Sequence, residues 1–129
     1  MTAFDLGPAI LFCPADRPER YAKAAERADA VILDLEDAVA PADKAAAREA
    51  LIATPLDPER TIVRVNAADT DDFALDLAAL QQTAYRLVML AKAEELPGAL
   101  DDYSVIALCE TARGVLAAPV LAQHPTSWR

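Results

Sequence analysis

Short apolar runs rich in Val, Ile and Leu recur along the chain, and between them lie longer stretches in which alanine and polar residues dominate. Runs this short and this uniformly apolar are typical of strands that are buried on both faces of a parallel sheet. The pattern predicts five strands, at residues 9–12, 30–35, 61–65, 87–90 and 105–108.

Helix-start signals stand in the stretches between these runs. Asp16 and Glu19, with Pro18 between them, have the spacing of a capping box that opens a helix. Pro97 and Gly98 instead predict that the fourth helix is short or irregular. The other helices are predicted to begin at Pro41 and Asp43, at Thr70 or Asp71, and at Thr111, the last of them running to Gln123 before Pro125.

The alternation of strand and helix predicts an α/β fold with parallel strands and right-handed crossovers. The length suits a single domain, residues 1–129, with about five βα units. Because a (β/α)₈ barrel needs about 250 residues, these units form either a complete open sheet or part of a barrel. A partial barrel would have the strand order 1-2-3-4-5, helices on one outer face, and apolar surface on its inner face and at the edge of the fifth strand.

Charge and composition exclude several classes of function. The formal net charge is −9, and no Lys/Arg cluster with interleaved aromatics offsets it, so we expect no nucleic-acid binding. Cys13 and Cys109 are too few for a disulfide framework and lack the paired spacing of a zinc site. The sequence shows neither a secretory leader nor an apolar run of about 18 residues, so we expect a cytoplasmic protein without a membrane span.

Polar residues follow every predicted strand at its carboxyl end, where parallel folds bind their ligands. We expect Glu36, Asp37, Arg64 and Glu110 to lie together at that end of the sheet, with Arg17 nearer its outer margin. The polar segments are 13–17, 34–37, 64–66, 92–94 and 110–111.

Four motifs resemble the citrate lyase β-subunit family, of the HpcH/HpaI aldolase type, which is related to the malyl-CoA lyases. They are LFCPADRPER at 11–20, LDLEDAVAP at 33–41, RVN at 64–66 and ETARG at 110–114, in the family's order and at similar spacing. The resemblance extends to about Ala122 and implies a partial TIM barrel. It also implies a homo-oligomeric, Mg²⁺-dependent carbon–carbon lyase that joins or separates an oxo-acid and an acetyl-type CoA thioester of the citryl, malyl or citramalyl class.

By this resemblance Glu110 is the magnesium ligand and contacts the substrate. Mg²⁺ prefers oxygen ligands and keeps several waters, so one or two carboxylates suffice. Alternatively, Glu110 caps the next helix or pairs with Arg113. The family's second ligand, an Asp after a sixth strand, has no counterpart here. We therefore expect weak Mg²⁺ binding unless Glu36 or Asp37 substitutes for it.

Arg64 corresponds to the family arginine that holds the carboxylate of the oxo-acid, a role suited to the two parallel donors of a guanidinium. Alternatively, it pairs with Glu36 or Asp37 for structural reasons. Those two carboxylates complete the predicted catalytic set, with the role of orienting Arg64 or metal-bound water. Asp34 is expected to be a structural hydrogen-bonding residue.

Phe12, Cys13, Arg17 and Lys23 correspond to family positions that contact CoA. The two cations suit its phosphates and Phe12 suits its adenine or pantetheine part; alternatively, the cations are solvated and Phe12 belongs to the core. Lys92 is interpreted as an electrostatic residue of the strand ends rather than a Schiff-base lysine.

A second hypothesis keeps the family but not the catalysis, and predicts a truncated acyl-CoA-binding or assembly module. The residues from Pro125 onward depart from the family pattern, so we expect a frameshift, a truncation or an excised fragment. Signalling receiver domains have a similar length, but they need an acidic pair after the first strand, where this chain has Cys13 and Pro14. That class is excluded.

Overall fold

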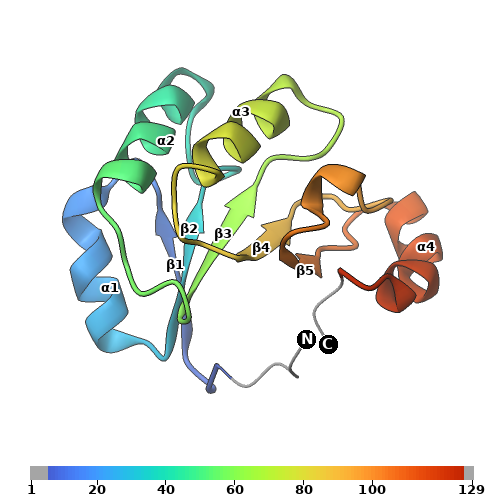
Figure 1. The fold of residues 1–129 in the computed structure, drawn as a ribbon, viewed down its shortest axis with the longest axis horizontal. Helices are drawn as coiled ribbons and strands as arrows, with labels where there is room; N and C mark the ends of the chain where they lie inside the picture. Colours follow the sequence, from blue (N-terminus) through green and yellow to red (C-terminus); the bar gives the residue numbers. More distant parts are fainter. Residues whose placement is uncertain (1–5, 127–129) are drawn as a thin grey trace.

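The computed structural model describes residues 6–126, in which five parallel strands form one sheet ordered β1-β2-β3-β4-β5 (Figure 1). This confirms the predicted α/β class, with parallel strands that alternate with helices, and the predicted strand order. The strands are β1 (Ile10–Pro14), β2 (Ala30–Asp34), β3 (Thr61–Val65), β4 (Leu87–Leu90) and β5 (Ser104–Ala107). The α-helices are α1 (Tyr21–Arg27), α2 (Lys44–Ala53), α3 (Asp71–Leu80) and α4 (Ala112–Gln123), and the 3-10 helices are η1 (Pro18–Arg20), η2 (Pro41–Asp43) and η3 (Gly98–Leu100).

Two helix starts differ from the predicted caps. Arg17 is the N-cap of η1 and makes no side-chain capping bond, so the predicted capping box of Asp16 and Glu19 is wrong. Thr70 likewise makes no side-chain cap to α3. Thr111, where the last helix was predicted to begin, is the N-cap of α4, and its side chain accepts a hydrogen bond from the N–H of Gly114. Both η1 and η2 begin with a proline, whose fixed φ suits the first turn of a helix without a side-chain cap.

The main core lies between the sheet and its helices. Each α-helix contributes a fully or largely buried side chain to this core, respectively Tyr21, Leu51, Leu80 and Leu121. They meet the Val and Leu side chains that alternate along the strands, such as Val63 on β3. The helices therefore cover one face of the sheet, as in a segment of a (β/α)₈ barrel.

The opposite face of the sheet is covered as well. Ile32, Ile62 and Met89 form a second buried cluster, with Met89 the most exposed at 7%. Leu6, which precedes β1, packs on this cluster with partly buried side chains of the strands. The expectation of bare apolar surface on this face is therefore wrong for the three central side chains.

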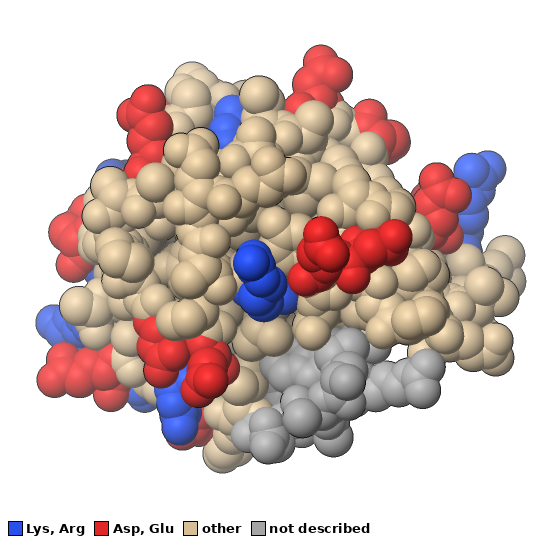
Figure 2. Space-filling model, in the orientation of Figure 1, with Lys and Arg blue, Asp and Glu red and all other residues tan. Residues whose placement is uncertain are grey.

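Exposed apolar surface lies near the two edges of the sheet, including the β1 edge of this same face, where Phe12 is paired with Ile32. Phe12 on β1 is 53% exposed, and Leu116 on α4 is 84% exposed. The edge of β5 is partly covered, because the N–H of Val105 donates to the carbonyl oxygen of Thr126 at 2.9 Å. Acidic and basic side chains are scattered around uncharged surface on the face shown in Figure 2. Within residues 6–126, no helix is long and apolar enough to span a bilayer.

Candidate functional site

A bidentate ion pair joins the carboxyl ends of β2 and β3. Asp34 and Arg64 face each other because the parallel register places them opposite one another on neighbouring strands. Nε of Arg64 donates to Oδ1 of Asp34 at 2.8 Å, and Nη2 donates to Oδ2 at 2.6 Å. Two of the three guanidinium nitrogens therefore donate to Asp34. The third, Nη1, is directed toward Glu36.

Asp34 is fully buried and also accepts hydrogen bonds from two backbone N–H groups. These come from Glu36 at 2.9 Å and Ala38 at 3.1 Å. Burial by itself would raise the pKa of Asp34, but the hydrogen bonds from Arg64 and from the backbone outweigh it and hold the pKa below its ordinary value. This geometry agrees with the structural role expected for Asp34.

Glu36 and Lys92 form the next ion pair along this end of the sheet. Glu36 is 5% exposed, and its Oε2 accepts a hydrogen bond from Nζ of Lys92 at 2.6 Å. Its Oε1 lies 3.5 Å from Nη1 of Arg64, without a hydrogen-bond partner. The exposed carboxylate of Asp37 lies 3.8 Å from the same ammonium. The hydrogen bond from Lys92 to Glu36 and the charges of Glu36, Asp37 and Glu110 together raise the pKa of Lys92.

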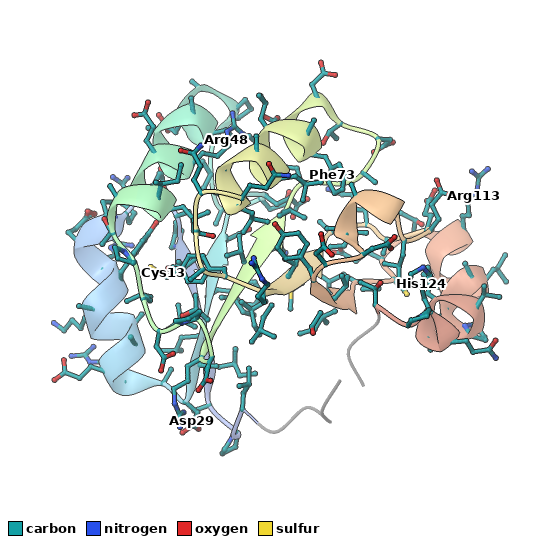
Figure 3. All side chains as sticks on the ribbon, in the orientation of Figure 1. Cys13, Asp29, Arg48, Phe73, Arg113 and His124 are labelled. Atoms are coloured by element: carbon teal, nitrogen blue, oxygen red, sulfur yellow. The ribbon has the colours of Figure 1, made fainter. Side chains whose placement is uncertain are left out.

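The ion-pair cluster at the carboxyl end of the sheet consists of Asp34, Glu36, Asp37, Arg64 and Lys92. Glu110 joins this cluster through the backbone of Lys92. Its Oε1 accepts a hydrogen bond from the Lys92 N–H at 3.0 Å. No hydrogen bond or ion pair in the described part of the chain links Glu110 directly to Arg64. Arg113 points away from the sheet (Figure 3), and the described ion pairs do not join it to Glu110. The alternatives for Glu110 were a cap on the next helix or an ion pair with Arg113. Because Thr111 caps α4 and the described ion pairs do not include Glu110 with Arg113, neither alternative gains support.

A second layer of polar side chains holds the ends of β2 and β3 in place. Nζ of Lys44 donates to the backbone carbonyls of residues 35 and 36, both at 2.9 Å, and to Oδ1 of Asn66 at 3.0 Å. Nδ2 of Asn66 donates to the buried Asp76 of α3 at 2.7 Å. Asp76 forms an ion pair with Arg48 of α2, which is labelled in Figure 3. Burial raises the pKa of Asp76. Sequence reasoning missed this layer, although Asn66 belongs to the RVN motif.

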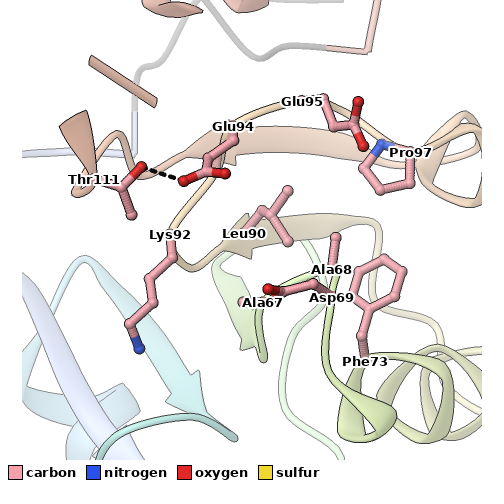
Figure 4. A pocket seen from close by; sticks show the side chains of 11 residues that line it. Ala67, Ala68, Asp69, Phe73, Leu90, Lys92, Glu94, Glu95, Pro97 and Thr111 are labelled. Carbon is pink, nitrogen blue, oxygen red and sulfur yellow. Dashed lines mark hydrogen bonds between the residues drawn. The ribbon is translucent and has the colours of Figure 1, made fainter. Parts of the chain in front are cut away.

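Two hollows open on either side of Lys92. One has a volume of about 440 Å³ and lies between the ends of β2 and β3, where Asp37 and Lys44 line it. The other has a volume of about 390 Å³, and there the Lys92 side chain extends away from Glu94, which accepts a hydrogen bond from Thr111 at 2.6 Å (Figure 4). Both hollows have the volume of a small-molecule site.

A third hollow, of about 430 Å³, lies between the edge of β1 and α1. Phe12, Cys13 and Lys23, three of the residues assigned to CoA, line it. Cys13 is buried among core residues, and burial raises the pKa of its thiol, which favours a packing role over a reactive one. The Phe12 ring lies 5.0 Å from the guanidinium carbon of Arg64, so it connects this hollow to the ion-pair cluster.

The cations of this hollow differ in part from those proposed from the sequence. Arg17 is not among its lining residues, whereas Arg20 and Arg27 are, together with Lys23. The spacing of these three residues carried the signal, since side chains three and four positions apart share one face of a helix.

The carboxylates of the cluster have the chemistry that a hard cation requires. Mg²⁺ takes oxygen ligands, and Glu36, Asp37 and Glu110 supply them around Lys92. Within residues 6–126, no three His, Cys, Asp or Glu side chains converge as a complete metal cage. The buried Oε1 of Glu36, which lacks a hydrogen-bond partner, leaves one acceptor available. The residues therefore fit a metal held by one or two carboxylates and otherwise by water and substrate.

Comparison with known families and proteins gives one consistent match. Residues 9–97 match the family model described as HpcH/HpaI aldolase/citrate lyase. A citrate lyase subunit beta-like protein from Mycobacterium tuberculosis is 63% identical over 123 residues, which are 93% of this chain and 45% of that protein. A (3S)-malyl-CoA thioesterase from Cereibacter sphaeroides is 35% identical over 91% of this chain and 45% of its own length.

The fold of a solved relative agrees closely with this one. The crystal structure of CitE from Mycobacterium tuberculosis, in complex with magnesium, acetoacetate and coenzyme A, superposes with a TM-score of 0.91 at 60% identity. The match covers 94% of this chain and 46% of that one. The chain thus spans less than half the length of these relatives.

Proposed function

The chain belongs to the HpcH/HpaI aldolase/citrate lyase family. From this premise we propose that it acts as a Mg²⁺-dependent carbon–carbon lyase. Its substrate would be an acyl-CoA-type thioester of the citryl, malyl or citramalyl class, which is cleaved to, or formed from, an oxo-acid and an acetyl-type thioester. The observation that carries the proposal is the Arg64 guanidinium, anchored by Asp34 and flanked by Glu36, at the carboxyl end of the sheet. The magnesium, acetoacetate and coenzyme A bound by the Mycobacterium tuberculosis relative support it.

The residues of this chain would divide the work as follows. Asp34 keeps the guanidinium of Arg64 in a fixed plane. Nη1 of Arg64, which lies 3.5 Å from Oε1 of Glu36, would bind the substrate carboxylate. Glu110 would hold Mg²⁺, with Glu36 and Asp37 orienting the groups around it. Bound Mg²⁺ would polarise the carbonyl of the oxo-acid. Lys92 adds positive charge where the anionic substrate approaches.

The second candidate function is a non-catalytic acyl-CoA-binding module. It is favoured by the hollow beside β1, which the described residues line with three cations and Phe12, whereas they supply no complete metal cage. The test is to incubate the purified chain with Mg²⁺ and malyl-CoA, citramalyl-CoA or citryl-CoA, and to measure released oxo-acid together with CoA binding. Oxo-acid release that chelation of Mg²⁺ abolishes supports the lyase, whereas CoA binding without release supports the module.

We expect Glu110→Gln to weaken Mg²⁺ binding at least about tenfold, because the amide removes the negative charge of the assigned ligand. Isothermal titration calorimetry with Mg²⁺ measures this directly. Glu49→Gln, on the exposed part of α2, makes the same change far from the cluster and should leave the affinity unchanged. Equal Mg²⁺ binding by the parent and Glu110→Gln proteins would refute the ligand assignment.

We expect Lys23→Glu to weaken CoA binding by about tenfold, because it reverses a charge inside the hollow beside β1. Arg17→Glu is the matched control, since it makes the same reversal on an exposed residue outside that hollow, and its effect should be smaller. Calorimetry with free CoA at low ionic strength measures both. A larger loss for Arg17→Glu would return the phosphate-binding role to Arg17.

A further inference from the structure

Lys92 contacts the carboxylate cluster with both of its ends. Its backbone N–H donates to Oε1 of Glu110 at 3.0 Å, and its ammonium donates to Oε2 of Glu36 at 2.6 Å. The same ammonium lies 3.8 Å from Oδ1 of Asp37. Lys92, two positions after the end of β4, therefore bridges carboxylates that follow β2 and β5.

The backbone of Lys92 has a conformation that side chains disfavour. Its φ is 49°, and it is the one non-glycine residue with positive φ in the described part of the chain. A left-handed conformation at a residue with a long side chain costs stability and persists where the surroundings require it. Here it directs the N–H toward Glu110 while the side chain reaches Glu36.

The burial of Glu36 explains why its carboxylate needs a neighbouring cation. Its side chain is 6% exposed, and its Oε1 has no hydrogen-bond partner. Arg64 gives its paired donors to Asp34 and approaches Glu36 only at 3.5 Å. Lys92 is thus the hydrogen-bonding cation of a carboxylate that would otherwise be buried with weak compensation.

We propose that the Lys92 ammonium is a built-in counter-cation that occupies this cluster and competes there with a divalent metal ion. The inference rests on the proposed function only in taking the cluster around Glu110 as the metal site. The Lys92 side chain is 49% exposed and flexible, so it can leave Glu36 when the metal enters. Lys92 would thereby raise the Mg²⁺ concentration at which the metal binds. At lower concentrations it would keep Glu36 paired.

The test is Mg²⁺ binding to the substrate-free chain, measured by titration calorimetry. Lys92→Gln removes the charge, and Lys92→Gly removes it while also suiting the positive φ, so the second variant guards against misfolding. Both should bind Mg²⁺ about tenfold more tightly than the parent. Lys92→Arg, which keeps the charge, should stay near the parent. Arg60→Gln, which removes one positive charge just before β3 at the opposite end of the sheet, should have no such effect.

A double variant locates the competition. In Lys92→Gln combined with Glu36→Gln, the gain in Mg²⁺ affinity should vanish, because the carboxylate that the ammonium covers is gone. Unchanged or weaker Mg²⁺ binding by Lys92→Gln and Lys92→Gly overturns the inference, as does a gain that survives Glu36→Gln. Tighter Mg²⁺ binding by Lys92→Gln, together with no oxo-acid release by the parent chain, would leave the inference standing and count against the lyase.

Discussion

Replacing Asp34 with alanine is expected to lower the free energy of unfolding by about 3–5 kcal/mol, the typical cost of breaking a buried ion pair from one side. The substitution leaves the Arg64 guanidinium, itself largely buried, without its bidentate partner. It also strips an acceptor from the N–H groups of Glu36 and Ala38. Urea denaturation followed by circular dichroism measures the loss.

The matched control is Asp43→Ala, which removes an exposed carboxylate that makes no side-chain capping bond to α2. It should change stability by less than about 0.5 kcal/mol. An Asp34→Ala protein within about 1 kcal/mol of the parent would contradict the assigned role. If that variant does not fold, Asp34→Asn, which keeps one acceptor oxygen, should show a smaller but measurable loss.

The effect of Asp34 should also depend on pH. Because the folded protein holds the pKa of Asp34 below its ordinary value, its ionised form stabilises the fold above the unfolded-state pKa of about 3.9. That contribution is lost as the pH falls below this value and through the folded-state pKa. The stability difference between the parent and Asp34→Ala should therefore narrow progressively below about pH 4.

Replacing Gly114 with alanine is expected to destabilise the protein by about 3 kcal/mol, at the upper end of the usual cost of overpacking. A Cβ at this position would lie 2.2 Å from the backbone carbonyl oxygen of Ala93 and 3.2 Å from Oγ1 of Thr111. The first turn of α4 must then move away from the segment that follows β4. Since Gly114 N donates to the capping Thr111 hydroxyl at 2.9 Å, the cap would be disturbed too.

Gly98→Ala provides the comparison for this substitution. A Cβ at Gly98 would meet only Oδ2 of Asp101, at 3.8 Å, which is an ordinary contact distance. Its free energy of unfolding should stay within about 0.5 kcal/mol of the parent. Thermal unfolding of the two variants side by side decides the point, and equal stability of Gly114→Ala and Gly98→Ala would show that α4 tolerates the displacement.

The arrangement of strands and helices was largely predictable from the hydrophobic pattern. The apolar residues 30–33 of β2, a strand in which all five residues are buried, indicated a strand covered on both faces. Helix starts were less predictable, because Asp16 and Glu19 have the spacing of a capping box but η1 begins without a side-chain cap. Spacing records which bonds are geometrically allowed, whereas competing local contacts decide which of them form.

The sequence by itself determined that polar side chains gather at one end of the sheet, because parallel strands bring all their carboxyl ends to the same edge. Only the tertiary structure decided how these side chains pair. The register of β2 and β3 gave the two hydrogen bonds of the Arg64 guanidinium to Asp34, and left Glu36 as a second ion-pair partner at 3.5 Å. The tertiary structure also joined Glu36 to Lys92, 56 positions apart, since pairing across strands depends on side-chain reach and backbone direction that no periodicity along the chain records.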